Sequence, residues 1–175
     1  MKYRILVPLD GSNVGEAVLT KLEELVLTNV PMPDVEVTFL KVISKINFNF
    51  LTEDEAAQIP YSESELRQLT GEAQEYLEKT ADTLRAKGIK VKTMVSVGHP
   101  AEEIVKAAHG IDANLIAMST HGRNGIVRWA IGSVTDAVIR LEGKIPVLAV
   151  RTPTKQKESQ VLPLGSLQGL VKHTY

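Results

Sequence analysis

The chain has 175 residues, of which 43% are apolar, a composition typical of one globular domain with a single core. Its 20 basic and 21 acidic residues leave a formal net charge of -1, so bulk charge gives no attraction to nucleic acid or to an anionic membrane. The absence of cysteine excludes disulfides, thiolate nucleophiles and thiolate metal sites. The start of the chain lacks a signal-peptide core, and no apolar run approaches the ~18 residues needed to span a bilayer. We therefore expect a cytoplasmic protein with no nucleic-acid and no membrane partner.

The first third of the chain predicts two buried strands around a helix. Residues 3–9 contain the contiguous apolar run 5–7, and residues 35–43 are expected to form the next strand. The helix between them follows the turn at residues 10–12 and ends near residue 29. The side chains expected in the core are Ile5, Leu6, Val7, Ala17, Val18, Leu22, Leu25, Val26, Val35, Val37, Phe39 and Leu40. Residues 44–61 are expected to form a loop, which is long for a compact domain and therefore either functional or partly mobile.

The rest of the chain continues to alternate helix and strand. A long helix over residues 62–87 is expected to begin at a Ser62 or Ser64 cap and to end at Gly88. Strands follow at 89–97, 115–118 and 145–150, separated by a short helix after Pro100 and a second helix over 133–141. Such alternation predicts one α/β domain, a doubly wound open five-stranded parallel sheet with helices on both faces. Residues 1–151 are assigned to this domain and 152–175 to a C-terminal tail.

Residues 119–133 have a composition that suits phosphate. Glycines such as Gly122 let backbone amides approach an anion, and Gly132 and Ser133 open a helix whose first amides are unpaired and whose dipole favours negative charge. Ser133 is expected to cap that helix and to donate to a phosphate oxygen. The alternative is an ordinary glycine-containing loop with a serine cap, and the residues alone leave both interpretations open.

Several segments together resemble the universal stress protein family. They are residues 5–12, 98–104, 118–125, 129–134 and 145–150, and the resemblance extends over about residues 2–151. ATP-binding members of that family carry Gly, two residues, Gly, nine residues, Gly and then Ser or Thr. Gly122, Gly132 and Ser133 match this pattern, whereas Ser119 replaces the first glycine, and a positive φ would cost more at a serine.

The resemblance implies a site for ATP, or alternatively ADP or AMP, with Mg²⁺ or Mn²⁺ bound through the phosphates. Asp10 would face the ribose or the nearby phosphate, although its alternative role is to close a turn or cap a helix. Val42 would contact adenine, while Met118, Ser119 and Gly122 would line the sugar and phosphates. The phosphate-binding helix start would comprise Gly132, Ser133, Val134 and Thr135.

The resemblance also implies a stress-response regulator that forms a homodimer through strand 145–150 and acts on an unknown protein partner. An apolar edge strand has unpaired backbone groups, which gives a physical reason for such pairing. No general base is evident, so hydrolysis of ATP would be slow at most. The alternative is a nucleotide-free dimeric interaction scaffold, for which Ser119 is the best support. Three interpretations are open for Phe48, Phe50 and Leu51: a lid over adenine, a dimer contact or a satellite cluster.

Overall fold

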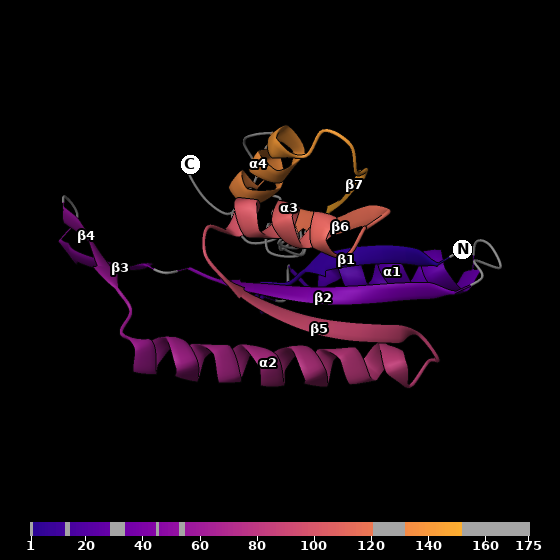
Figure 1. Ribbon diagram of the computed structural model, residues 1–175, viewed down its shortest axis with the longest axis horizontal. Helices are drawn as coiled ribbons and strands as arrows, with labels where there is room; N and C mark the ends of the chain where they lie inside the picture. The colour runs from indigo at the N-terminus through magenta and orange to yellow at the C-terminus, as the bar shows by residue number, and fades with distance from the viewer. Residues whose placement is uncertain are drawn as a thin grey trace, which may run out of the picture.

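The computed structural model describes residues 2–12, 15–28, 34–44, 46–52, 55–120 and 132–151, with the backbone alone for 46–52 and 55–60. The helices and strands alternate along the chain, except that β3 and β4 come between β2 and α2 (Figure 1). Their bounds are β1 Tyr3–Pro8, α1 Ala17–Thr28, β2 Val35–Ile43, β3 Ile46–Thr52, β4 Glu55–Pro60, α2 Glu63–Arg85, β5 Lys90–Val97, α3 Pro100–Gly110, β6 Leu115–Thr120, α4 Ser133–Leu141 and β7 Val147–Arg151.

Five strands form one parallel sheet in the order β5-β2-β1-β6-β7. The chain moves from β1 outward to β2 and β5, then returns to the other side of β1 to add β6 and β7. The direction of winding therefore reverses at β1, as in a doubly wound fold. The predicted fold class, a single α/β domain with a five-stranded parallel sheet, is confirmed.

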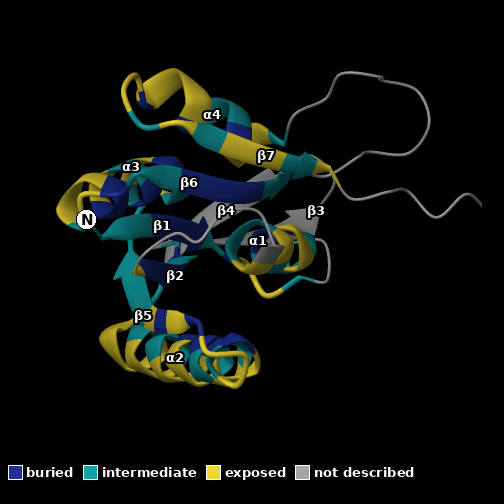
Figure 2. Cartoon of the chain, turned by 90° about the vertical axis from the view of Figure 1, so that its right-hand side faces the viewer, coloured by how far each residue is buried: buried dark blue, intermediate teal, exposed yellow. Residues whose placement is uncertain are grey.

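The sheet has a hydrophobic core on each face. Alternate residues such as Val37 and Phe39 pack with α1 and α2, whereas Leu6, Leu40 and Ile116 pack with α3 and α4. The central strands are the most deeply buried part of the molecule (Figure 2). The predicted core is confirmed in the strands, while the predicted α1 residues Ala17, Leu25 and Val26 are only half-buried.

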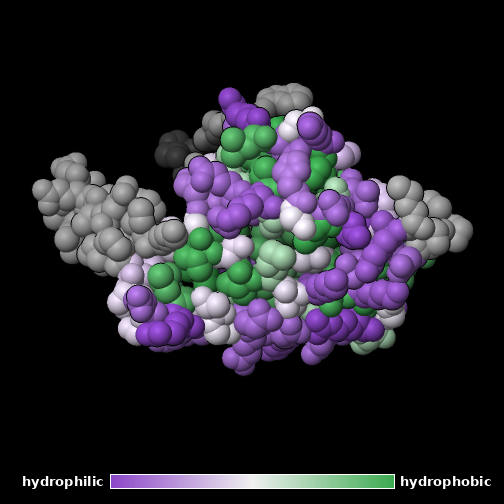
Figure 3. Space-filling view, in the orientation of Figure 1, coloured by the Kyte–Doolittle hydropathy of each residue, from purple (hydrophilic) through white to green (hydrophobic). Residues whose placement is uncertain are grey.

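Helix α2 has the start and end that its sequence predicts. The Ser62 hydroxyl accepts from the Glu65 amide at 3.3 Å, and the Ser62 amide donates to the Glu65 carboxylate at 2.8 Å, which forms a capping box. Gly88, with φ of 84°, follows the helix in the left-handed conformation that glycine tolerates. The buried stripe is Ala73, Leu77, Ala81 and Leu84, and the outer surface over α2 is predominantly hydrophilic (Figure 3).

The expectation of a loop over residues 44–61 is wrong. Strands β3 and β4 pair antiparallel as a hairpin, from Ile46 opposite Pro60 to Thr52 opposite Glu55. The signal in the sequence is the alternation of Ile46, Phe48 and Phe50 with asparagines, which is the period of a strand. The length of the segment indicated a loop, whereas this short-range alternation indicates strands.

Two predicted boundaries also need correction. Helix α1 begins at Ala17, several residues after the turn, and β7 begins at Val147 rather than residue 145. The later start of β7 has a local cause. The Glu142 carboxylate accepts hydrogen bonds from the amides of Lys144 and Ile145, which holds these residues in a turn.

Candidate functional site

The carboxyl ends of β1, β2 and β6 surround a cavity of about 610 Å³. This is the end of the sheet, and the point of reversed winding, at which ligands bind in open α/β folds. Eight of the nine predicted site residues line the cavity: Asp10, Val42, Met118, Ser119, Gly132, Ser133, Val134 and Thr135. The ninth, Gly122, lies outside the described residues, as do His121, Trp129 and residues 152–175. Four separate segments of the chain thus meet at one place.

Six further residues line the cavity and were not assigned to it from the sequence: Pro8, Leu9, Gly15, Leu40, Pro100 and Ile104. Leu40 could have been found, because it lies two residues before Val42 on the same face of β2. Pro100 and Ile104 come from α3, whose approach to β2 no local pattern reveals. Together with Val42 these side chains make the β2 side of the cavity apolar, whereas the β1 turn and the start of α4 supply polar groups.

Asp10 is held in a tight turn after β1. Its Oδ1 atom accepts from the amide of Ser12 at 2.9 Å and from the Ser12 hydroxyl at 2.7 Å. Gly15 closes the turn so tightly that a Cβ atom there would lie 2.2 Å from Oδ1 of Asp10. The carboxylate is exposed, and its Oδ2 atom has no hydrogen-bond partner among the described residues. This oxygen is therefore available to a hydroxyl group or a cation in the cavity.

Ser119 connects the end of β6 to the start of α1. Its hydroxyl donates to the carbonyl of Gly15 at 2.9 Å and accepts from the amide of Val18 at 2.9 Å. Within the described ranges, the non-glycine residues with positive φ are Asp34 and Asp112, so the backbone of Ser119 is not in the left-handed region. Serine consequently replaces glycine here without backbone strain, and its hydroxyl is already engaged within the protein.

Helix α4 presents unpaired amides to the cavity. The cap is Gly132 and not Ser133, which corrects the sequence prediction, and no side chain caps the helix. The first intrahelical bond runs from the Asp136 amide to the Gly132 carbonyl. The amides of Ser133, Val134 and Thr135 have no partner in the described part of the chain, and all three residues line the cavity. These amides and the positive end of the helix dipole favour an anion.

The backbone of Val42 is directed toward the open space beyond β1. The Leu40 carbonyl accepts from Leu9, the last bond toward β1, whereas the Ile43 carbonyl accepts from Gly98 on the β5 side. Because backbone groups alternate along a strand, the amide and carbonyl of Val42 point to the β1 side, where β1 has already ended. One donor and one acceptor thus lie side by side at the apolar part of the cavity.

Among the described residues, no helix combines the length and the apolar character that crossing a membrane requires. The described side chains contain no group of three or more histidines, cysteines, aspartates or glutamates that could hold a metal ion.

Comparison with known proteins gives the family. Residues 1–151 match the model of the Universal stress protein family. This chain belongs to the universal stress protein family. The match extends from β1 to β7 and includes every described residue that lines the cavity.

Two similar members of the universal stress protein family come from Methanocaldococcus jannaschii. Universal stress protein MJ0577 is 33% identical over 164 residues, covering 86% of this chain and 96% of that protein. Universal stress protein MJ0531 is 33% identical over 153 residues, covering 87% and 84%. The solved structure of MJ0577 superposes with a TM-score of 0.62 at 30% identity, over 87% of this chain and 97% of the other.

A more distant universal stress protein family member, from Arabidopsis thaliana, was solved with AMP bound. It has 15% identity and a TM-score of 0.59, and covers 90% of this chain and 97% of its own. At this identity the likeness establishes the shared fold.

Proposed function

We propose that this protein is a cytoplasmic, homodimeric stress-response regulator that binds adenine nucleotide, with ATP as the ligand. The observation that carries the proposal is the cavity at the sheet end, which joins an apolar wall to three unpaired helix amides. Its volume of about 610 Å³ is suited to a small ligand, and pockets of this kind are mostly apolar with a few placed polar groups. A nucleotide matches this arrangement, because its flat base would lie on the apolar wall and its anionic phosphates would lie at the helix amides.

The apolar wall is suited to adenine. The half-buried side chains of Val42 and Pro100 would pack against the base, and the free amide and carbonyl of Val42 would meet its edge. On the edge that carries N7, adenine presents an amino donor beside a ring-nitrogen acceptor, whereas guanine presents two acceptors, N7 and O6. The donor–acceptor pair of Val42 therefore favours adenine over guanine.

The polar wall is suited to ribose and phosphate. The free Oδ2 atom of Asp10 would accept a hydrogen bond from a ribose hydroxyl, and the amides at the start of α4 would donate to phosphate oxygens. The exposed Ser133 hydroxyl adds a further donor. Mg²⁺ or Mn²⁺, held by the phosphates rather than by a cluster of side chains, would neutralise part of their charge.

Hydrolysis of ATP at this site is expected to be slow at most. Asp10 is the one carboxylate among the described residues that line the cavity, and its Oδ1 atom is bound to Ser12. A general base must reach the attacking water, and the arrangement offers no second carboxylate or imidazole for that role in the described lining. The site therefore supports binding and regulation better than turnover.

The proposed homodimer would form through β7, which is an edge of the sheet. Because Pro146 directs its carbonyl toward β6, the backbone groups of Val147, Ala149 and Arg151 point away from the sheet. Leu148 and Ala149 have exposed side chains, so this edge is apolar as well as unpaired. Antiparallel pairing with a second copy would satisfy these backbone groups across a two-fold axis.

A thermal-shift titration tests nucleotide binding. At 100 times Kd, ATP stabilises the folded state by roughly 2.7 kcal/mol, which raises the melting temperature by about 5–10 °C in a chain of this size. GTP is the matched control and should give a smaller shift. Absence of a shift at millimolar ATP would favour the nucleotide-free scaffold, for which the occupied hydroxyl of Ser119 is the supporting observation.

A further inference from the structure

The sheet has a second edge strand, β5, whose backbone groups are also turned outward. The Gly98 amide donates to the Ile43 carbonyl of β2. Because backbone groups alternate along a strand, the amides and carbonyls of the even-numbered residues of β5 point toward β2. The amides and carbonyls of Val91, Thr93 and Val95 therefore point away from the sheet. An open edge of this kind is a template for pairing with another chain.

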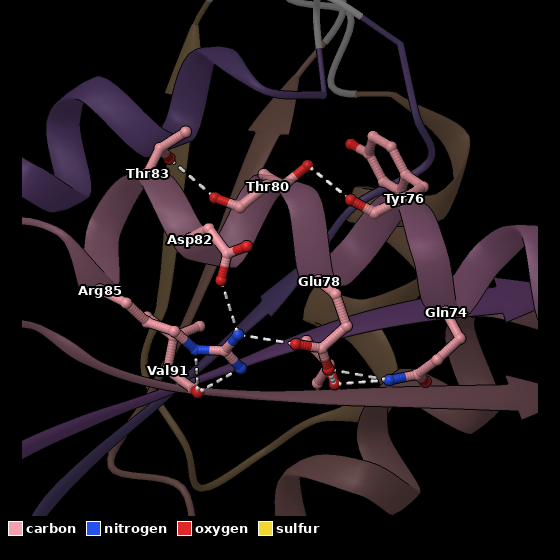
Figure 4. Close-up of polar contacts among 9 residues, drawn as sticks. Gln74, Tyr76, Glu78, Thr80, Asp82, Thr83, Arg85 and Val91 are labelled. Carbon is pink, nitrogen blue, oxygen red and sulfur yellow. Dashed lines mark hydrogen bonds and ion pairs between the residues drawn. The ribbon is translucent and has the colours of Figure 1, made fainter.

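Arg85 of α2 covers the outward carbonyl of Val91. Its Nε atom donates to that oxygen at 3.1 Å and one terminal nitrogen, Nη2, at 3.0 Å, so two arms of the guanidinium hold one backbone acceptor (Figure 4). A strand added at β5 needs this same oxygen for its own amide. The two N–H groups of Arg85 thus occupy the position that a pairing strand would take.

Two acidic side chains of the same helix hold Arg85 in place. Its Nη1 atom lies 2.6 Å from a Glu78 carboxylate oxygen and 3.0 Å from one of Asp82 (Figure 4). The hydrogen bonds from Thr93 and Arg85 hold the pKa of Glu78 below its usual value, so this residue stays charged beside the edge. A planar guanidinium fixed by carboxylates is an ordered hydrogen-bond donor.

Helix α2 also holds the side chain of Thr93, the next residue of β5 whose backbone groups point outward. The Thr93 hydroxyl bonds to Glu78 and accepts from the Gln74 amide at 2.8 Å. Helix α2 therefore lies alongside β5 (Figure 1), and its polar side chains form hydrogen bonds with the strand (Figure 4). At β7, by contrast, no side-chain hydrogen bond to the outward groups of Val147, Ala149 or Arg151 is present in the described part of the chain.

We propose that Arg85 closes the β5 edge against strand addition, so that association with a second copy is confined to the β7 edge. The confinement of association to the β7 edge rests on the proposed homodimer, whereas the closure of the β5 edge by Arg85 does not. A chain with both edges open could pair β5 of one copy with β7 of the next, and such a head-to-tail contact builds larger rings or open chains instead of a two-fold dimer. The guanidinium on Val91 therefore limits the assembly to a closed dimer.

The test is the solution mass of the full chain, measured by light scattering over a range of concentrations. R85A should give a mass that rises with concentration above that of the wild type and falls again on dilution. R67A is the matched control, because Arg67 is an exposed arginine of the same helix, and it should keep the wild-type mass. An unchanged mass for R85A overturns the proposal.

A second variant separates strand addition from unfolding. Thr93→Pro removes an outward amide without breaking the ladder to β2, and proline is tolerated on an edge strand in this position. R85A combined with T93P should return to the wild-type mass with retained circular dichroism. If the double variant still associates, the association comes from unfolded chain and the proposal is overturned. If the wild type itself is a monomer, the homodimer proposal fails, while a reversible rise for R85A still supports the role of Arg85.

Discussion

Ser119 and Val18 are joined by a hydrogen bond of 2.9 Å, in which the Val18 amide donates to the Ser119 hydroxyl. These residues lie 101 positions apart in the chain, at the end of β6 and the start of α1. The same hydroxyl donates to the Gly15 carbonyl, so it fixes the segment that follows Asp10 to strand β6. The serine in place of the family's glycine is therefore a structural connection between two walls of the site.

The first prediction concerns Ser119→Gly, which would restore the glycine of the family pattern. Loss of two hydrogen bonds should lower the free energy of unfolding by about 1–3 kcal/mol, and ATP affinity should not improve. Ser119→Ala is the control, because it removes the hydroxyl without adding backbone freedom. Urea unfolding and ATP titration of both variants provide the measurement. A clear gain in ATP affinity for the glycine variant would show that the serine obstructs the site.

Gly15→Ala should damage the site more than the fold. The added Cβ would lie 2.2 Å from Oδ1 of Asp10, so the carboxylate or the turn must move. We expect ATP affinity to fall about tenfold or more, which corresponds to at least ~1.4 kcal/mol. Gly71→Ala is the matched control, since no atom lies within 4 Å of the new Cβ in α2, and it should stabilise the helix by about 0.5–1 kcal/mol. Equal ATP affinity in the two variants would show that the Asp10 turn takes no part in ATP binding.

Features that follow from local sequence patterns could be predicted from the sequence, whereas contacts made in irregular turns or between distant residues could not. The apolar side chains of residues 35–43 identified Val37 and Phe39 as core, and the segments that resemble the family include Asp10 and Ser133, which line one cavity. Gly15 was missed because its contact with Asp10 arises in an irregular turn with no repeating pattern. The Ser119 connection was missed for a different reason: a hydrogen bond between residues so distant in the chain leaves no local trace.

The proposed role of the α4 amides leads to a sharper substitution, Ser133→Pro. Proline is tolerated as the first residue of a helix, and the preceding Gly132 already has φ of −56° and ψ of 147°, which suits a residue before proline. The variant should keep the melting temperature of the ligand-free protein yet bind ATP about tenfold or more weakly. Ser133→Ala keeps the amide and isolates the hydroxyl. Retained affinity in the proline variant would exclude this amide as a phosphate ligand.

Glu142 should give the protein an acid-sensitive contribution to stability. Its side chain is 1% exposed, and its oxygens meet two amides and, at 2.8 Å, Nε2 of His109. Burial raises the pKa of this carboxyl, but the amides of Ile145 and Lys144 and then His109 outweigh burial and hold it below its usual value. The unfolded chain therefore takes up the proton first, and stability is lost as pH falls below the ordinary range of a glutamate.

The measurement is the melting temperature between pH 6 and pH 3 for the wild type and Glu142→Gln. The glutamine is neutral throughout, so the variant should be less stable at pH 6 and lose less on acidification. Glu72→Gln on the exposed face of α2 is the control and should follow the wild type. Parallel acid profiles for the wild type and the Glu142 variant would mean that this buried carboxylate makes no pH-dependent contribution.

The proposed function requires an adenine nucleotide in the cavity at the carboxyl ends of β1, β2 and β6. Mass spectrometry of the small molecules released by denaturing freshly purified protein tests this most directly. Wild-type protein should release ATP, ADP or AMP in amounts that approach one per chain, and Ser133→Pro prepared in parallel should release far less. Wild-type protein that carries no nucleotide and takes none up after incubation with millimolar ATP and Mg²⁺ would contradict the central claim.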